Sequence, residues 1–489
     1  MLPFKSLIEI DRNAHQAIYL QVANRFITLI RDGMIRPGTF LPGSRILADL
    51  LGLHRKTVVA AYDELVSQDW VVPVPRKGMM VATNLPMVKP RTFSGAVHAY
   101  AQQPAFEMNT FPVLPHPNKV GATKKLVVND GFPDVRLAPL EDWMKECRSL
   151  IQQPGYARNL AATAVAGNLH LRTQLVKHLS DTRGLNITPS NIMITRGAQM
   201  SIYLAAATLI RKGDYVIVGS PNYYFADLTF EQLGAKLLRV PVDNHGIDVD
   251  AIERLCKSKR IKLLYVISHH HHPTTVTLSA ERRMKLLEII RKYNLAVIED
   301  DYDYDFYYSA SPIVPLASAD HGGNVIYVGS FTKSLGLSLR MGFMIAPEMF
   351  IERAAQLRQL MDLGGDNLVE EALGNMLKAG VIARHLKKAN KVYRERRDLA
   401  GELLQQQLGN KVSFELPQGG MAIWLQFDPA CNLAAVTIRA ADLGLTMNNG
   451  YRYFYGTQPG NAIRFGFASL NQRELTQAVT IIRKAMDRM

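Results

Sequence analysis

Cysteine is scarce in this sequence, which has three cysteines in 489 residues. Cys147, Cys256 and Cys431 lie far apart, and their spacing matches no zinc-binding motif. A sparse, odd set of cysteines also argues against a fold held together by disulfide bonds and is typical of a reducing compartment. We therefore expect a cytoplasmic protein.

Long hydrophobic runs are missing as well. No apolar stretch approaches the roughly 18 residues that a membrane-spanning helix needs. The first segment turns polar at Glu9, Asp11 and Arg12, which does not fit the apolar core of a signal peptide. The sequence also has no internal repeats. We therefore expect a soluble globular protein without a membrane partner.

Positive charge, by contrast, is in excess. The net charge of +14 and the isoelectric point near 9.5 suit a polyanionic partner such as DNA. Single domains usually contain about 100–150 residues, so a chain of 489 residues predicts two or three folding units.

Three regimes follow one another along the chain. Residues 1–83 have the pattern of short helices followed by a hairpin. Residues 84–124 are rich in proline and have little periodicity, which is typical of a linker, because proline cannot be accommodated within helices or central strands. Residues 125–489 alternate short apolar runs with long amphipathic stretches and form the expected body.

The apolar runs of the body are rich in β-branched residues and are separated by helix-sized segments. This pattern predicts buried parallel strands in an α/β sheet. The runs are Ile192–Thr195, Tyr215–Val218, Leu263–Ile267, Leu295–Ile298 and Val325–Val328.

The first 83 residues predict a helix-turn-helix followed by a wing. An apolar stripe marks a helix over Ile18–Ile30, and Ser44 is a candidate N-cap for a short helix that ends at Leu50. Gly52 provides the turn into a second helix. That helix begins with polar and basic residues, as a recognition helix does. The segments Trp70–Val72 and Met79–Val81 are the expected wing strands. The alternative is a small helical subdomain with a solvated basic turn.

This segment, residues 17–82, resembles the GntR family of winged-helix regulators. The matching residues are Leu41-Pro42-Gly43-Ser44-Arg45, Ala48, Leu51-Gly52, Arg55, Thr57-Val58, Ala61-Tyr62, Leu65 and Gly78. The resemblance implies that the segment binds double-stranded DNA and that Gly78 lets the wing approach a phosphate. His54 stands where a small hydroxyl residue is usual. The candidate DNA-binding residues are Arg45, His54, Arg55, Lys56, Thr57, Arg76, Lys77 and Gly78.

A lysine follows the last of the apolar runs. Lys333 lies among small hydroxyl residues, where a desolvated amine is nucleophilic and can form a Schiff base. Ser330 and Thr332 can donate hydrogen bonds to a phosphate, and Arg340 can neutralise its charge. The alternative is an ordinary surface lysine in a loop.

Carboxylates end the run that begins at Leu295. A carboxylate at the end of a buried strand is costly unless it meets a cation, and a protonated pyridine nitrogen is such a cation. Asp300 is the candidate for this role, and Tyr302 could bond the phenolic oxygen of the ring. The acidic residues that follow suggest an EF-hand, but Phe306 and Pro312 occupy its glycine and glutamate positions. A solvated acidic turn is the other alternative.

Two further elements complete the candidate site. Gly197, Ala198 and Gln199 join a strand to a helix, and the free N–H groups at such a turn can bind phosphate. Arg464 is embedded in an apolar strand and needs an anionic partner. A carboxylate of the ligand would be a bidentate partner, and a structural salt bridge is the alternative.

In this order, the elements from about Leu126 to the end resemble the fold-type I pyridoxal-phosphate enzymes of the aminotransferase family. The resemblance implies a large, mostly parallel α/β/α domain with a smaller C-terminal α+β subdomain, and pyridoxal 5'-phosphate as cofactor. It assigns Lys333 as the aldimine lysine and Tyr223 as the residue stacked on the ring. It assigns the phosphate to Gly197, Ala198, Gln199, Ser330, Thr332 and Arg340.

One segment departs from the aminotransferase pattern. Asn-Pro-Thr-Gly usually precedes the aspartate strand, whereas this chain has His272-Pro273-Thr274-Thr275, so that His272 replaces the asparagine at the cofactor ring. Ordinary transaminase turnover is therefore not assured. We expect no metal site in the run His269–His272, because successive side chains of a strand point to opposite faces.

The full chain resembles the MocR regulators, which join a GntR-like head to an aminotransferase-like body. This resemblance implies a homodimer that binds an operator and controls genes of vitamin B6 or amino-acid metabolism. We expect the body to sense the cofactor or an amino compound through an aldimine. The alternatives are an active aminotransferase with a vestigial head and a purely structural dimerisation body.

Overall fold

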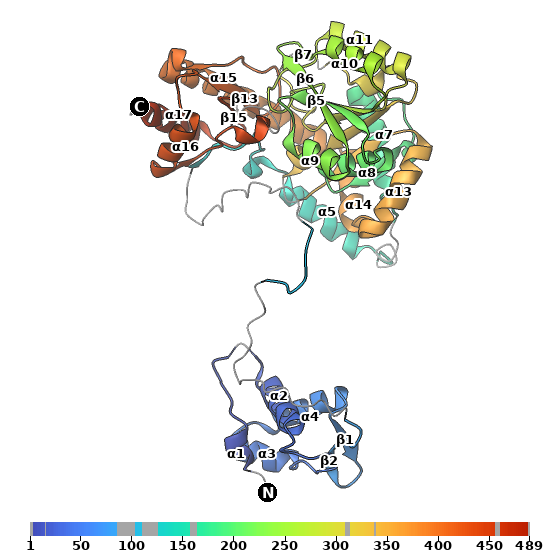
Figure 1. The fold of residues 1–489 in the computed structure, drawn as a ribbon, viewed down its shortest axis with the longest axis vertical. Coiled ribbons are helices and arrows are strands. Elements are labelled where there is room, and N and C mark those ends of the chain that lie inside the picture. Colours follow the sequence, from blue (N-terminus) through green and yellow to red (C-terminus); the bar gives the residue numbers. More distant parts are fainter. Residues whose placement is uncertain are drawn as a thin grey trace. The chain divides into compact units, whose positions relative to one another are not determined.

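A computed structural model describes residues 3–14, 16–85, 103–109, 126–156, 164–308, 313–336, 339–454 and 460–487. The chain divides into two compact units, Met1–Asn109 and Thr110–Met489 (Figure 1). Most of the expected linker 84–124 lies outside the described residues, and so does Pro312.

The first unit, called the head below, combines short helices with a two-stranded antiparallel sheet (Figure 1). Apolar side chains from helices α2, α3 and α4 and from both strands form a core of its own. The hydroxyl of the buried Tyr62 donates a 2.6 Å hydrogen bond to the carbonyl of Pro42. The elements are α1 (Phe4–Leu7), α2 (Ile18–Arg31), α3 (Ser44–Leu51), α4 (Arg55–Ser67), β1 (Val71–Val74) and β2 (Gly78–Val81).

The turn between α3 and α4 has the expected chemistry with two changes. Gly52 has a φ of 62°, a left-handed conformation that favours glycine, and it ends α3. Gly43 is the N-cap of α3 in place of the predicted Ser44, which is the first residue of the helix. His54 lies before α4, and its Nδ1 accepts a 3.2 Å hydrogen bond from the Lys56 amide. His54 is therefore the N-cap of α4, a position where a small hydroxyl residue is usual.

The second unit, the body, contains an eight-stranded sheet in the order β4-β11-β10-β9-β8-β5-β6-β7. All five predicted runs form strands that point in one direction. The structure adds β6, β7 and β11, of which β11 is antiparallel to both β10 and β4. The strands are β4 (Ile192–Thr195), β5 (Tyr215–Ser220), β6 (Lys236–Asp243), β7 (Gly246–Ile247), β8 (Ile261–Val266), β9 (Val297–Asp301), β10 (Val325–Ser330) and β11 (Gly342–Ile345).

Helices cover both faces of this sheet, as the alternation within its strands shows. In β5, Val216 and Val218 belong to one apolar core, while Ile217 belongs to another. Because successive side chains of a strand point to opposite faces, these cores lie on the two sides of the sheet. The helices of this part are α5 (Leu140–Gln152), α7 (Leu169–Arg183), α8 (Ala198–Leu209), α9 (Tyr224–Gln232), α10 (Val249–Ser258), α11 (Ala280–Tyr293), α12 (Thr332–Leu335), α13 (Glu348–Asp362) and α14 (Asn367–Lys378).

A smaller α+β part, drawn in orange to red, follows towards the C-terminus (Figure 1). Its antiparallel sheet has the order β12-β13-β15, and a short strand, β14, pairs with β3 at the start of the body. Residues that follow β3 thus reach this part from more than 300 positions away in the sequence. The elements are β3 (Leu126–Val127), α15 (Val381–Leu408), β12 (Val412–Ser413), β13 (Ala422–Phe427), α16 (Leu433–Asp442), β14 (Leu445–Thr446), β15 (Ala462–Gly466) and α17 (Gln472–Met486).

Among the described residues, no helix is long and apolar enough to span a membrane.

Candidate cofactor and effector site

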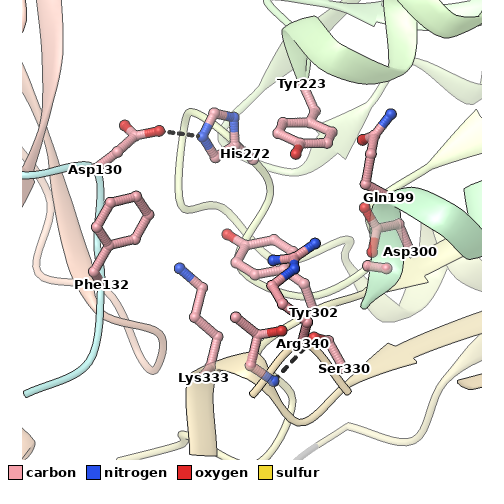
Figure 2. A pocket seen from close by; sticks show the side chains of 12 residues that line it. Asp130, Phe132, Gln199, Tyr223, His272, Asp300, Tyr302, Ser330, Lys333 and Arg340 are labelled. Carbon is pink, nitrogen blue, oxygen red and sulfur yellow. Dashed lines mark hydrogen bonds and ion pairs between the residues drawn. The ribbon is translucent and has the colours of Figure 1, made fainter. Parts of the chain in front are cut away.

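A cavity of about 160 Å³ opens where the carboxyl ends of several parallel strands meet (Figure 2). Strands β9 and β10 and the turns after β4 and β5 bring together side chains that are far apart in the sequence. Ten of the twelve lining residues are among those singled out above; Asp130 and Phe132 are the others. The lining consists of Asp130, Phe132, Ala198, Gln199, Tyr223, His272, Asp300, Tyr302, Ser330, Thr332, Lys333 and Arg340.

The Lys333 amine lies inside this cavity and is not an ordinary surface amine. Its Nζ donates a 2.6 Å hydrogen bond to the carbonyl of Gly131 and lies 4.8 Å from the centre of the Phe132 ring. Burial lowers the pKa of Lys333 to about 8, although Asp303 and Asp130 act in the opposite direction. The amine is therefore neutral, and nucleophilic, at a lower pH than other lysines.

Asp300 is buried at the end of β9. One carboxylate oxygen accepts a 2.7 Å hydrogen bond from the Tyr265 hydroxyl, and the other, Oδ1, has no partner in the described part of the chain. Burial raises the pKa of Asp300 to about 7, against the effect of the Tyr265 hydrogen bond. A buried acceptor without a donor is costly, so this oxygen fits the N–H of a protonated pyridine ring.

The acidic residues after Asp300 are not a solvated turn. Asp301 lies 3.3 Å from His269 Nδ1, Asp303 lies 2.9 Å from His270 Nδ1, and Asp305 lies 2.9 Å from an Arg183 nitrogen. Each of the three carboxylates thus has a basic side chain of the protein beside one of its oxygens. These ion pairs hold the strand end that carries Asp300.

The phosphate candidates surround the N-terminus of α8. Gly197 has a φ of 85°, and a Cβ at this position would lie 2.9 Å from Arg340 Nη2. The Oγ1 atom of Thr332, which is buried, has no hydrogen-bond partner in the described residues. The backbone N–H groups of a helix N-terminus, an unpaired hydroxyl and a guanidinium are groups that can together bind an anion.

The aromatic residues line the same cavity. Tyr223 faces it from the turn before α9 (Figure 2), and its ring centre lies 5.2 Å from that of His272 in an edge contact. Tyr302 lines the cavity too, but its hydroxyl donates a 2.8 Å hydrogen bond to the backbone carbonyl of His270. The described donors and acceptors together fit pyridoxal 5'-phosphate: an acceptor for the ring nitrogen, an amine for the aldehyde and an anion site for the phosphate.

The four histidines follow β8 and do not belong to a strand, so the alternation that we used against a metal site does not apply to them. Each has a partner of its own instead. His269 and His270 bind Asp301 and Asp303, His271 bonds Thr274 at 2.9 Å, and His272 bonds Asp130 at 2.9 Å. In the described ranges, no three His, Cys, Asp or Glu side chains gather as metal ligands would.

Arg464 does not line the cavity. Its side chain on β15 is 1% exposed, and its Nε and Nη1 donate hydrogen bonds to the carbonyls of Asp130 and Pro273 at 3.2 and 3.1 Å. Its Nε also lies 3.7 Å from the Asp130 carboxylate. Asp130 was not expected from the sequence. The only local indication of a functional role is that this carboxylate stands next to a glycine just after a short apolar run.

The candidate DNA-binding residues gather on the head. The α3–α4 pair and the loop between β1 and β2 carry them. Thr57 is half-buried, and the others are exposed: Arg45, His54, Arg55, Lys56, Arg76, Lys77 and Gly78. Arg55 lies over the start of α3, with its Nε 3.4 Å from the Ser44 hydroxyl.

Comparisons with known proteins agree with both halves of this description. Residues 124–482 match the family "Aminotransferase class I and II", and residues 18–81 match the "Bacterial regulatory proteins, gntR family". The probable rhizopine catabolism regulatory protein MocR of Rhizobium meliloti is 24% identical over 98% of this chain and 96% of its own. The HTH-type transcriptional regulator TauR of Rhodobacter capsulatus is 26% identical over 94% of both chains.

Solved structures are similar to the body. The α-aminoadipate aminotransferase LysN of Thermus thermophilus is 25% identical and has a TM-score of 0.69 over 74% of this chain and 92% of its own. An archaeal alanine:glyoxylate aminotransferase is 30% identical, with a TM-score of 0.70 over 75% of this chain and 92% of its own. The chain therefore belongs to the aminotransferase class I and II family and carries a gntR-family head, the architecture of the MocR-type regulators.

Proposed function

We propose that this protein is a DNA-binding transcriptional regulator whose body binds pyridoxal 5'-phosphate and responds to the cofactor or to an amino compound. The observation that carries this proposal is a head with its own core that exposes cations on its helix-turn-helix and wing. The N-terminal side chains of such a second helix reach base edges and phosphates in a major groove. A DNA partner also fits a cytoplasmic location and the net charge of +14.

The residues of the cavity hold the cofactor in this proposal. Asp300 accepts a hydrogen bond from the ring nitrogen, Lys333 presents its amine, and Tyr223 covers the ring. When bound, the cofactor supplies an aldehyde that combines with amines and a ring that withdraws electrons. For the body to act as a switch, the ligand must bind its two states with different affinity. We expect a homodimer, because two heads can then contact two half-sites.

The test measures operator affinity at one fixed salt concentration, with an operator selected from random duplexes. Arg55→Ala or Lys56→Ala should weaken binding by roughly 1–3 kcal/mol if the residue reads a base. Lys484→Ala, which removes an exposed cation from α17, is the matched control. Unchanged affinity in both head variants would contradict the assignment of α4 as the recognition helix.

The second candidate function is an active aminotransferase, which the fold and the Lys333 and Asp300 geometry favour. The observation against an active aminotransferase is the hydrogen bond between His272 and Asp130. It lies where the usual aminotransferase pattern has an asparagine at the cofactor ring. Steady-state transamination with a panel of amino donors distinguishes the two. Turnover at about 1 s⁻¹ or faster, which is typical of enzymes, would favour the aminotransferase.

A further inference from the structure

Asp130, a carboxylate of the chain itself, lines the cavity beside Arg464. Asp130 follows β3 and points towards His272 (Figure 2), whose Nε2 lies 2.9 Å from its Oδ2. The Tyr453 hydroxyl donates a hydrogen bond to Oδ1, and Arg464 Nε lies 3.7 Å from the same oxygen. Asp130 thus contacts the arginine expected to receive a ligand carboxylate and the histidine that replaces the asparagine.

Arg464 has little capacity left for a second anion. Its side chain is 1% exposed, and two of its nitrogens are bound to the carbonyls of Asp130 and Pro273. A ligand carboxylate would have to displace Asp130 from Arg464, or bind beside it as a second negative charge.

Asp130 already balances the charge of Arg464. Burial alone would raise the pKa of Asp130, but His272, Arg464 and Tyr453 outweigh it and hold the pKa below its ordinary value, so Asp130 is ionised. Burial lowers the pKa of His272 despite the opposing effect of Asp130, so this histidine is neutral near pH 7. Asp130 and Arg464 therefore form an ion pair, and a second buried carboxylate would have to share the charge of Arg464 with Asp130, which is costly.

We propose that Asp130 takes the place of a ligand's α-carboxylate, so that the pocket selects amines with no carboxylate on the carbon next to nitrogen. The proposal rests on the proposed function, in which the cavity binds the cofactor and an amino compound. The lining next to Lys333 is apolar at Phe132, which suits a neutral substituent at that carbon.

The test compares amines with amino acids that differ only in the α-carboxylate. Ethylamine with L-alanine, and 2-phenylethylamine with L-phenylalanine, are titrated into the full-length protein loaded with pyridoxal 5'-phosphate. The apparent dissociation constant of each compound is read from the visible absorbance of the cofactor. It is divided by the constant that the same compound gives with free cofactor, so that differences in intrinsic reactivity are removed. We expect the protein to prefer each amine by about tenfold or more, which is 1.4 kcal/mol. This comparison needs no variant.

Asp130→Asn then removes the charge and keeps the shape. The charge of Arg464 is then no longer balanced by residue 130, so the preference should shift about tenfold towards the amino acids. Asp130→Ser is a second variant with the same expectation. Asp243→Asn is the matched control, because it removes a carboxylate bound to Arg282 at 2.6 Å outside the cavity and should leave the preference unchanged.

No amine preference in the wild-type protein, or a preference that Asp130→Asn and Asp130→Ser leave unchanged, overturns the proposal. Failure of the proposed function has a different signature: no visible absorbance band after addition of the cofactor, or no binding of the selected operator.

Discussion

Burial of the Lys333 amine sets the pH at which it becomes nucleophilic. An exposed lysine loses its proton near pH 10.4, whereas the pKa of Lys333 is lowered to about 8, chiefly by burial. Below pH 8 the amine is protonated and cannot attack an aldehyde; above pH 8 it is neutral. The rate at which the cofactor-free protein captures pyridoxal 5'-phosphate should therefore rise with pH, reach half of its maximum near pH 8 and level off about one pH unit higher.

The measurement is stopped-flow absorbance, followed by borohydride trapping and peptide mapping. The adduct should map to Lys333 and disappear in Lys333→Ala. A rate that keeps rising to pH 10, or an adduct on another lysine, would contradict the assignment.

The buried carboxylate of Asp300 destabilises the folded protein when no cofactor is bound. Its pKa in the folded protein, about 7, lies above its ordinary value of 3.8, so the folded state keeps a proton that the unfolded state has released. The contribution of Asp300 to the stability of the cofactor-free protein therefore falls as the pH rises from about 4 to 7, and the full cost, on the order of 4 kcal/mol, is present above pH 7.

Asp300→Asn removes this cost. We expect the variant without cofactor to resist urea better than the wild type at pH 8, with a difference that shrinks towards pH 5. The same variant should bind the cofactor more weakly. A cofactor-free variant that is less stable at pH 8 would show that the ionised carboxylate is stabilised in some other way.

Most of the cavity residues could be predicted from the sequence, because they follow recognisable strand ends. Asp130 could not, since its role arises from side chains such as His272 and Arg464 that are 142 and 334 positions away. No local pattern carries that information, and only the folded chain brings the three groups together.

At the scale of elements, five parallel strands could be predicted because burial on both faces makes them continuously apolar. The parallel strand β6 was not predicted, because it is only partly buried and carries polar residues. Strand β11 was missed because Gly342–Ile345 closely follows the candidate phosphate-binding segment, with no helix-sized stretch between them. The fold needs it there: a Cβ on Gly342 would lie 2.7 Å from the Gly197 backbone. The strand therefore packs directly against the turn that begins α8.

The same turn provides a test of the anion site. In Gly197→Ala, the new Cβ would meet Arg340 Nη2 at 2.9 Å, and the φ of 85° is strained for alanine. We expect about tenfold weaker cofactor binding, measured by equilibrium dialysis. Gly213→Ala is the matched control, because its φ is 93° but nothing lies within 4 Å of a Cβ there. Equal losses in both variants would attribute the effect to backbone strain alone.

At the scale of the whole molecule, the chain separates a DNA-reading unit from a sensing unit. The head has its own core, so residues Met1–Thr83 should fold when expressed alone. We expect this fragment to bind a selected operator by roughly 10²-fold or more weakly than the full chain, because the body supplies dimerisation and hence a second, tethered head.

Fluorescence anisotropy at one salt concentration measures this difference, and circular dichroism of the fragment is the control for folding. A folded fragment that binds as tightly as the full protein would mean that the body contributes no avidity.

The run of four histidines has a practical consequence for anyone who purifies this protein. In sequence it looks like a short affinity tag, yet no member is more than 8% exposed and each side chain already has a partner. Immobilised nickel should therefore reach these imidazoles only after the body has opened. We expect untagged chain to be held more firmly by the resin in concentrated urea than in native buffer, and the native flow-through would then be enriched in folded molecules.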